Sequence, residues 1–244
     1  MKITVRQLAE SALMIAAATL LSLVKIDLPF GGGVTVVSML PIILISHRYG
    51  WKWGVLTAFV YSVAQLLLGL DNVAYAENFL MGAGIILLDY IVAYTVIGLS
   101  GVFGKSRAAV ATGIAVTFTL RFLCHLITGA WIWGVWMPDE FMGLKMTNPW
   151  FYSFLYNGWY MLFELVITEA VAMLIYSPLK AFLSNKVTEE YTAGNRYRIF
   201  KVFIVLKGTF HSILNSKMNK ISVVPAVLSN FSQETVCVLE MYPV

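Results

Sequence analysis

The gaps between the long apolar runs of this 244-residue chain alternate in the sign of their charge. One set of gaps is basic and holds Lys2 and Arg6, Arg48 and Lys52, Lys105 and Arg107, and Lys180 and Lys186. The other set is mainly acidic and holds Asp27, Asp71, Glu77, Asp139 and Glu140, with Lys25 and Lys145. Because basic loops remain on the cytoplasmic side of a bilayer, the alternation predicts a multi-pass membrane protein whose N-terminus is cytoplasmic.

The composition excludes a soluble domain of this size. Hydrophobic residues make up 59% of the chain, charged residues 12%, and the mean hydropathy is +0.77. The net charge of +4 is spread over short loops and forms no basic stripe, so it predicts membrane topology and no nucleic-acid partner. Cys124 and Cys237 have no CxxC spacing, which indicates neither a disulfide framework nor a metal site.

The apolar runs predict an all-α integral membrane protein built as a bundle of six transmembrane helices. The expected helices cover residues 6–25, 33–47, 52–69, 79–103, 107–131 and 150–180. Pro41 and the glycines at 31–33 predict a broken or tilted second helix that lines a cavity enclosed by protein, because irregular backbone cannot face lipid.

The chain divides by composition into a membrane domain, residues 1–186, and a C-terminal tail, residues 187–244. In the tail, Lys201, Lys207 and His211 interrupt the apolar pattern, so the segment is a poor membrane span. A cytoplasmic extension, an amphipathic surface segment and the product of a shifted reading frame all fit this pattern. We expect weak order there, and the role of the tail stays open.

Ionisable groups within the expected spans are few, and each costs about 3 kcal/mol or more at the bilayer centre unless it faces a cavity or a partner. From the helix rise, Asp89 lies ~14 Å, Arg121 ~15 Å, His125 ~9 Å and Asn157 ~10 Å below the outer end of its helix. Polar groups from three helices therefore share one depth, which predicts a ligand pocket nearer the outer face. The alternatives are a structural ion pair between Asp89 and Arg121 and a packed, neutral His125.

Aromatic residues gather in the outer loop between the fifth and sixth helices, which contains Trp131, Trp133, Trp136 and Trp150. Such rings form either an interfacial belt or a lid over a pocket. A carboxylate, several rings, a histidine and an amide together suit a flat, aromatic, cationic solute.

Four segments carry a resemblance to a known family: "VTVVSMLPIILISHRYGWKWG" after a glycine run, "LLDYIVAYTVIGLSGVFG", "LRFLCHLITGAWIWG" and "NPWFYSFLYNGWYM". In this order they resemble the thiamine-specific substrate-binding (S) component of energy-coupling factor vitamin transporters, over about residues 5–185. The resemblance implies a thiamine-binding bundle in a bacterial plasma membrane.

The resemblance implies roles for five pocket residues. Asp89 matches the acidic thiamine ligand, His125 the pocket histidine, and Trp133 the ring that stacks on the vitamin. Tyr152 and Asn157 match the tyrosine and asparagine of the last motif. These two are about 140° apart on an ideal helix, so we expect both to reach one pocket only if Tyr152 precedes the regular helix. Loop 70–78 is longer than the family pattern, so the resemblance assigns no ligand contact there and leaves that question open.

The resemblance also implies partners. Ala12 and Ala16 match the small-residue surface with which family members dock onto a transmembrane coupling subunit, although ordinary packing in the bundle would use the same residues. The chain has no GxxxxGK[ST] motif, so we expect no cofactor of its own and ATP use by two partner ATPases.

The sequence therefore predicts high-affinity capture and uptake of thiamine, with no catalytic residues. One alternative is an S component for another vitamin, such as riboflavin, or for a thiamine precursor. A further alternative is an intramembrane enzyme that uses Asp89 and His125 as an acid–base pair. The absence of an HExxH signature and of a second carboxylate at a matching depth argues against that enzyme.

Overall fold

The structure is a computed structural model that describes residues 3–183. The chain divides into two units, residues 1–186 and residues 187–244. The predicted tail therefore lies outside the described residues, and its role stays a prediction.

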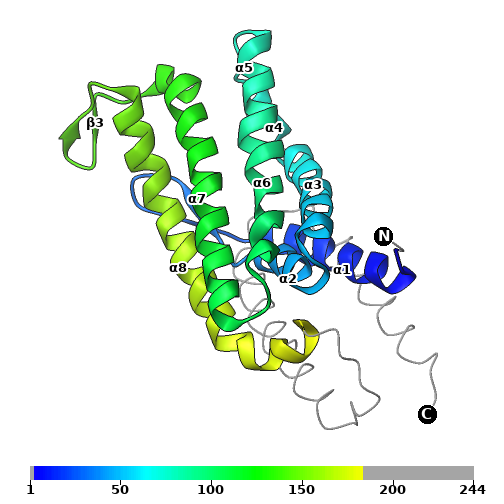
Figure 1. Ribbon diagram of the computed structural model, residues 1–244. Coiled ribbons are helices and arrows are strands. Elements are labelled where there is room, and N and C mark those ends of the chain that lie inside the picture. Colours follow the sequence, from blue (N-terminus) through cyan, green and yellow to red (C-terminus); the bar gives the residue numbers. More distant parts are fainter. Residues whose placement is uncertain (1–2, 184–244) are drawn as a thin grey trace, which may run out of the picture. The chain divides into compact units, whose positions relative to one another are not determined.

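The first part of the chain contains helices and one β-hairpin, which follows the first helix (Figure 1). In order, it contains α1 (Val5–Ser22), β1 (Lys25–Asp27), β2 (Gly33–Thr35), α2 (Leu40–Tyr49), α3 (Trp51–Leu68) and the short α4 (Leu70–Val73). The two strands pair antiparallel, with Ile26 opposite Val34.

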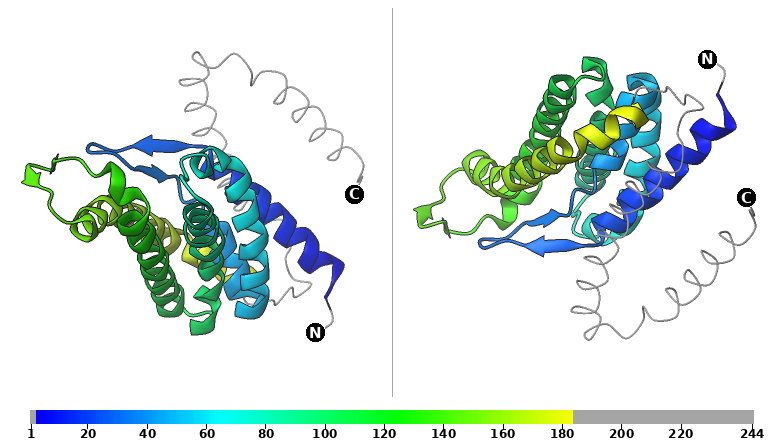
Figure 2. Two further views of the ribbon diagram at one scale, coloured as in Figure 1. Left: turned by 90° about the horizontal axis from the view of Figure 1, so that it is seen from above. Right: turned by 90° about the horizontal axis from the view of Figure 1, so that it is seen from below.

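The second part is dominated by long helices. A helical rod over residues 79–103 comprises α5 (Phe79–Gly84), η1 (Ile85–Val92), α6 (Ala93–Thr95) and η2 (Val96–Phe103). It is followed by α7 (Arg107–Trp131), η3 (Trp133–Trp136), β3 (Glu140–Phe141), β4 (Leu144–Lys145) and α8 (Pro149–Leu183). Helices α7 and α8 pack side by side (Figures 1 and 2).

Helix α2 is the centre of the bundle. Every residue from Leu40 to Arg48 is buried, and α1, α3, η2 and α8 pack against this helix. Ile42 and Ile43 join one core cluster with Tyr61 of α3 and Phe118 of α7. A helix that is buried all round contacts an element on every side, so α2 anchors the elements that surround it.

The all-α membrane class is confirmed, but the second helix differs from the prediction. Residues 33–35 form a strand, and α2 has 10 residues, or about 15 Å, which is too short to cross a bilayer. The predicted break in the segment 33–47 is therefore present, and Pro41 lies just after it, in the first turn of α2, where its missing N–H breaks no hydrogen bond. The expectation that this helix lines a cavity is wrong, because Gly33 and Thr35 of β2 line the cavity described below and α2 does not.

Among the described residues, 4 helices are long and apolar enough to span a membrane: 51–68, 79–103, 107–131 and 149–180. These match four of the predicted spans to within about two residues. Helix α1 has 18 residues but carries Arg6 and Glu10, and Glu10 pairs with Arg48 of α2. This ion pair fixes α1 against the buried helix.

The rod over residues 79–103 is not a regular α-helix. Residues Ile85–Val92 form a π-helix, and Val96–Phe103 continue as a 3₁₀-helix. A π-turn moves the side chains after it to a new direction, and such turns are frequent at functional sites. The consecutive residues Asp89 and Tyr90 both face the cavity described below.

Candidate functional site

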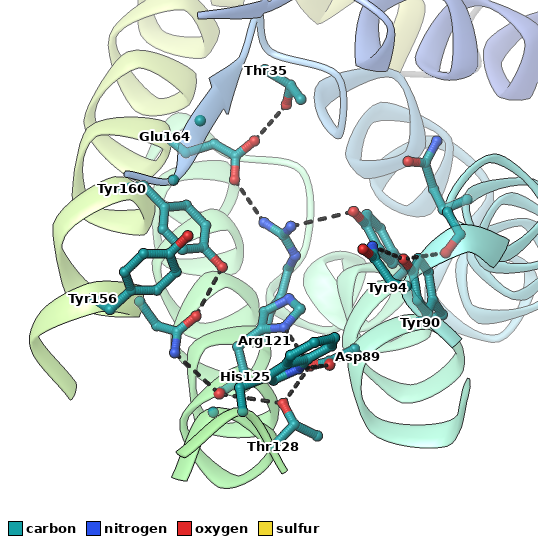
Figure 3. Close-up of a pocket in the computed structure, with 18 of the residues that line it drawn as sticks. Thr35, Asp89, Tyr90, Tyr94, Arg121, His125, Thr128, Tyr156, Tyr160 and Glu164 are labelled. Atoms are coloured by element: carbon teal, nitrogen blue, oxygen red, sulfur yellow. Dashed lines mark hydrogen bonds and ion pairs between the residues drawn. The ribbon is translucent and has the colours of Figure 1, made fainter. Parts of the chain in front are cut away.

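A cavity of about 830 Å³ lies within the described bundle. Its walls come from the β1–β2 hairpin, α3, α4, the rod 79–103, α7, η3 and α8. Figure 3 shows polar and aromatic side chains converging on this space. The lining includes all six pocket residues predicted from the sequence: Asp89, Arg121, His125, Trp133, Tyr152 and Asn157.

Asp89 is the centre of a hydrogen-bonded group on one side of the cavity. Its Oδ1 atom lies 2.9 Å from Nδ1 of His125 and also accepts a hydrogen bond from Thr128 Oγ1. Its Oδ2 atom accepts from Nε1 of Trp133 at 2.9 Å. A carboxylate has about four acceptor positions, so these donors orient Asp89 and leave capacity for a ligand.

Trp133 belongs to an aromatic wall beside Asp89. Its ring lies 6.1 Å from Tyr75 and 5.6 Å from Trp136, measured between centroids. Trp133 and Trp136 both line the cavity, so these rings have the contacts of a pocket wall rather than of a lipid-facing belt alone. A wall of rings next to an oriented carboxylate attracts a flat cation through stacking and cation–π contacts.

Asn157 lies across the cavity on α8. Its Nδ2 atom donates to the backbone oxygen of His125 at 3.2 Å, and its Oδ1 atom accepts from Tyr160 at 3.0 Å. The amide therefore ties α8 to the turn of α7 that carries His125. Among the described residues, Nε2 of His125 is a buried ring nitrogen without a hydrogen-bond partner, and such an atom is available to a ligand.

Arg121 forms a second polar group, one helical turn along α7 from His125. Its Nη1 atom lies 2.7 Å from Oε2 of Glu164, and both side chains are almost fully buried. The guanidinium carbon lies 4.8 Å from the centroid of the Tyr94 ring. Asp89 pairs with His125 and not with Arg121, so the alternative of an Asp89–Arg121 ion pair is wrong.

Tyr152 also corrects an expectation. It lies inside α8, near the start of the regular helix, yet both Tyr152 and Asn157 line the cavity. The condition that Tyr152 must precede the helix is wrong, because the cavity is wide enough to touch two sides of α8.

The structure adds cavity residues that sequence reasoning missed, namely Tyr75, Tyr90, Tyr94, Tyr156 and Tyr160. Glu164, whose role the sequence left open between a pair across the bundle and a place in a cavity, does both. A signal for several of them was present. Tyr152, Tyr156, Tyr160 and Glu164 follow one another at intervals of four, which places them along one stripe of a helix. Tyr75 comes from loop 70–78, whose ligand contacts the sequence left open.

The fold and the site define a class: a multi-pass membrane protein with a solute-binding cavity inside its helix bundle. The cavity offers an oriented carboxylate, an unpaired imidazole nitrogen, an amide and a wall of rings. These groups are suited to holding an aromatic cation by contacts alone.

Comparison with known proteins identifies the family. The model of the thiamine transporter protein family matches residues 8–183. The thiamine transporter ThiT of Bacillus subtilis is 35% identical over 195 residues, covering 73% of this chain and 94% of that protein. ThiT of Lacticaseibacillus paracasei is 28% identical over 179 residues, covering 66% and 82% respectively. The chain belongs to the thiamine transporter protein family, whose members are transporters rather than enzymes.

A solved structure described as ThiT from Listeria monocytogenes has the same fold. It superposes with a TM-score of 0.60 at 19% identity, covering 73% of this chain and 97% of that chain. At this identity the likeness concerns the fold alone.

Proposed function

We propose that this protein captures thiamine with high affinity outside the cell and delivers it inward. It acts as the S component of an energy-coupling factor transporter in a bacterial plasma membrane, with its N-terminus in the cytoplasm. The observation that carries the proposal is the position of Asp89, whose carboxylate lies against Trp133 in a ring-lined cavity of a thiamine transporter family member.

The chemistry of thiamine fits this cavity. Thiamine has an aminopyrimidine ring joined to a positively charged thiazolium ring. Asp89 supplies a counter-charge, and its side chain is only 12% exposed, so electrostatic attraction there is stronger than in bulk water. Trp133 and Tyr75 provide faces for stacking, and Asn157 and His125 provide polar atoms near the ring edges. The role of each residue in binding remains a prediction.

The proposed energy source lies in partner subunits. The chain docks through α1 onto a transmembrane coupling subunit that is driven by two ATPases. Ala12 and Ala16 are exposed on α1, as a docking surface requires. The ion pair between Glu10 and Arg48 holds the same helix against the bundle.

An uptake assay tests this proposal. Bacterial cells that lack their own thiamine uptake are supplied with this protein, the coupling subunit and both ATPases, and accumulation of radiolabelled thiamine is measured. Accumulation should require every component. Uptake that persists with inactive ATPases would contradict the proposed mechanism of energisation.

A further inference from the structure

The polar group around Arg121 has no part in the binding scheme above, although it lines the same cavity. Arg121 comes from α7 and Glu164 from α8, and Figure 3 shows the guanidinium between Glu164 and Tyr94. Glu164 is fixed from its other side as well, because Thr35 of β2 donates to its Oε1 atom at 2.5 Å. Since it is held at both oxygens, the carboxylate stays on the guanidinium.

The ionisable residues that line the cavity determine its net charge. Besides Asp89 and the imidazole of His125, the described lining has three ionisable groups other than tyrosines: Lys25, Arg121 and Glu164. Lys25 is exposed on β1, where water screens its charge. Glu164 offsets the charge of Arg121, so among the described buried lining residues the negative charge of Asp89 is left without a permanent cation. One net negative charge complements one organic cation.

Without the carboxylate of Glu164, Arg121 would present an unpaired cation to the cavity and would attract anionic ligands. The guanidinium group binds phosphate through paired hydrogen bonds and is a preferred phosphate ligand in proteins. A phosphate monoester carries about −1.5 to −2 charge at pH 7. Arg121 lies within the cavity, one helical turn from the group around Asp89. It is therefore placed to meet a phosphate attached to a ligand that binds there.

We propose that Glu164 makes the cavity select the unphosphorylated cation over its phosphate ester. Its carboxylate occupies the guanidinium of Arg121 and repels the phosphate group of the ester. The inference rests on the proposed function, because it assumes that thiamine is the cation. Specificity of this kind is a difference between two affinities, and a like charge placed against the competitor is one way to produce it. Glu164 is then a specificity residue that need not touch thiamine itself.

The test is a comparison of two ligands on purified full-length protein. The dissociation constants of thiamine and thiamine monophosphate are measured by calorimetry for the wild type and for Glu164→Gln. In Glu164→Gln, the preference for thiamine over its monophosphate should fall by about tenfold or more, since a free guanidinium gains a charge-assisted hydrogen bond. An unchanged preference, or an equal loss of affinity for both ligands, would overturn the proposal.

Two controls separate selectivity from a general disturbance. Glu169→Gln makes the same chemical change on the same helix at a residue outside the cavity lining, and it should leave the preference unchanged. The double variant Arg121→Gln with Glu164→Gln removes the guanidinium as well, and it should lose the gained affinity for the monophosphate. A double variant that keeps this gain would show that Arg121 is not the phosphate ligand.

Removal of Glu164 leaves a buried cation, which can impair folding. If Glu164→Gln is not recovered, Glu164→Asp keeps the charge but withdraws it from Arg121 by one methylene group. It should shift the preference in the same direction by a smaller factor, and no shift would overturn the proposal. A wild-type protein that fails to bind thiamine would instead contradict the proposed function, so the two failures are distinguishable.

Discussion

At the scale of residues, the site depends on donors that fix the direction of one carboxylate. Asp89 accepts hydrogen bonds from His125, Thr128 and Trp133, which come from α7 and η3. A carboxylate held in this way needs little reorganisation when a cation arrives, and such preorganisation favours tight binding.

Replacement of Asp89 by asparagine keeps the shape of the side chain and removes its charge. Thiamine affinity should fall by roughly 1 to 3 kcal/mol, because the cation loses its counter-charge in a largely buried part of the cavity. Equilibrium titration measures the change. Asp71→Asn, at an exposed residue of α4, is the matched control and should bind as the wild type does.

Trp133 has two separable contributions, its ring and its Nε1 hydrogen bond to Asp89. Trp133→Ala should weaken thiamine binding by about 1 to 2 kcal/mol through lost stacking and cation–π attraction, and a neutral thiamine analogue should lose less. Trp133→Phe keeps a ring and should retain part of this affinity. Equal losses for the charged and neutral ligands would show that Trp133 acts through packing alone. Trp150→Ala, at a residue that is 53% exposed, serves as the control.

At the scale of elements, four membrane spans were predictable, because a long apolar run with charged residues at its ends rarely forms anything but a membrane-spanning helix. The β1–β2 hairpin was not predictable, because strands of 3 residues are too short to show an alternation of apolar and polar side chains. The sequence also predicted that Asp89, Arg121 and His125 share a depth. It could not give the direction of Asp89 around its helix, because the π-helix Ile85–Val92 departs from regular α-helical geometry. The pairing of Arg121 with Glu164 therefore required the structure.

Helix α1 presents Ala12 and Ala16 on its exposed side. Ala12→Leu with Ala16→Leu should leave thiamine binding unchanged, because neither residue lines the cavity, but should abolish uptake by preventing close helix contact with the coupling subunit. Binding and uptake are measured side by side. Ala170→Leu enlarges an exposed alanine on α8 and should affect neither. Normal uptake in the double variant would exclude this face as the docking surface.

At the scale of the whole molecule, the binding function is predicted to reside in the first unit. Within residues 3–183, those that line the cavity lie between Ser22 and Glu164, and the family match ends at residue 183. A protein truncated after Lys186 should therefore bind thiamine as tightly as the full chain does. Titration of both proteins tests this expectation, and a large loss of affinity on truncation would assign residues 187–244 a part in the site or its stability.

The most direct test of the central claim is a calorimetric titration of the detergent-purified full-length protein with thiamine and, separately, with riboflavin. The account predicts tight, saturable binding of thiamine and none of riboflavin, because the neutral flavin ring offers nothing to balance the charge of Asp89. Equal binding of both vitamins, or of neither, would contradict it.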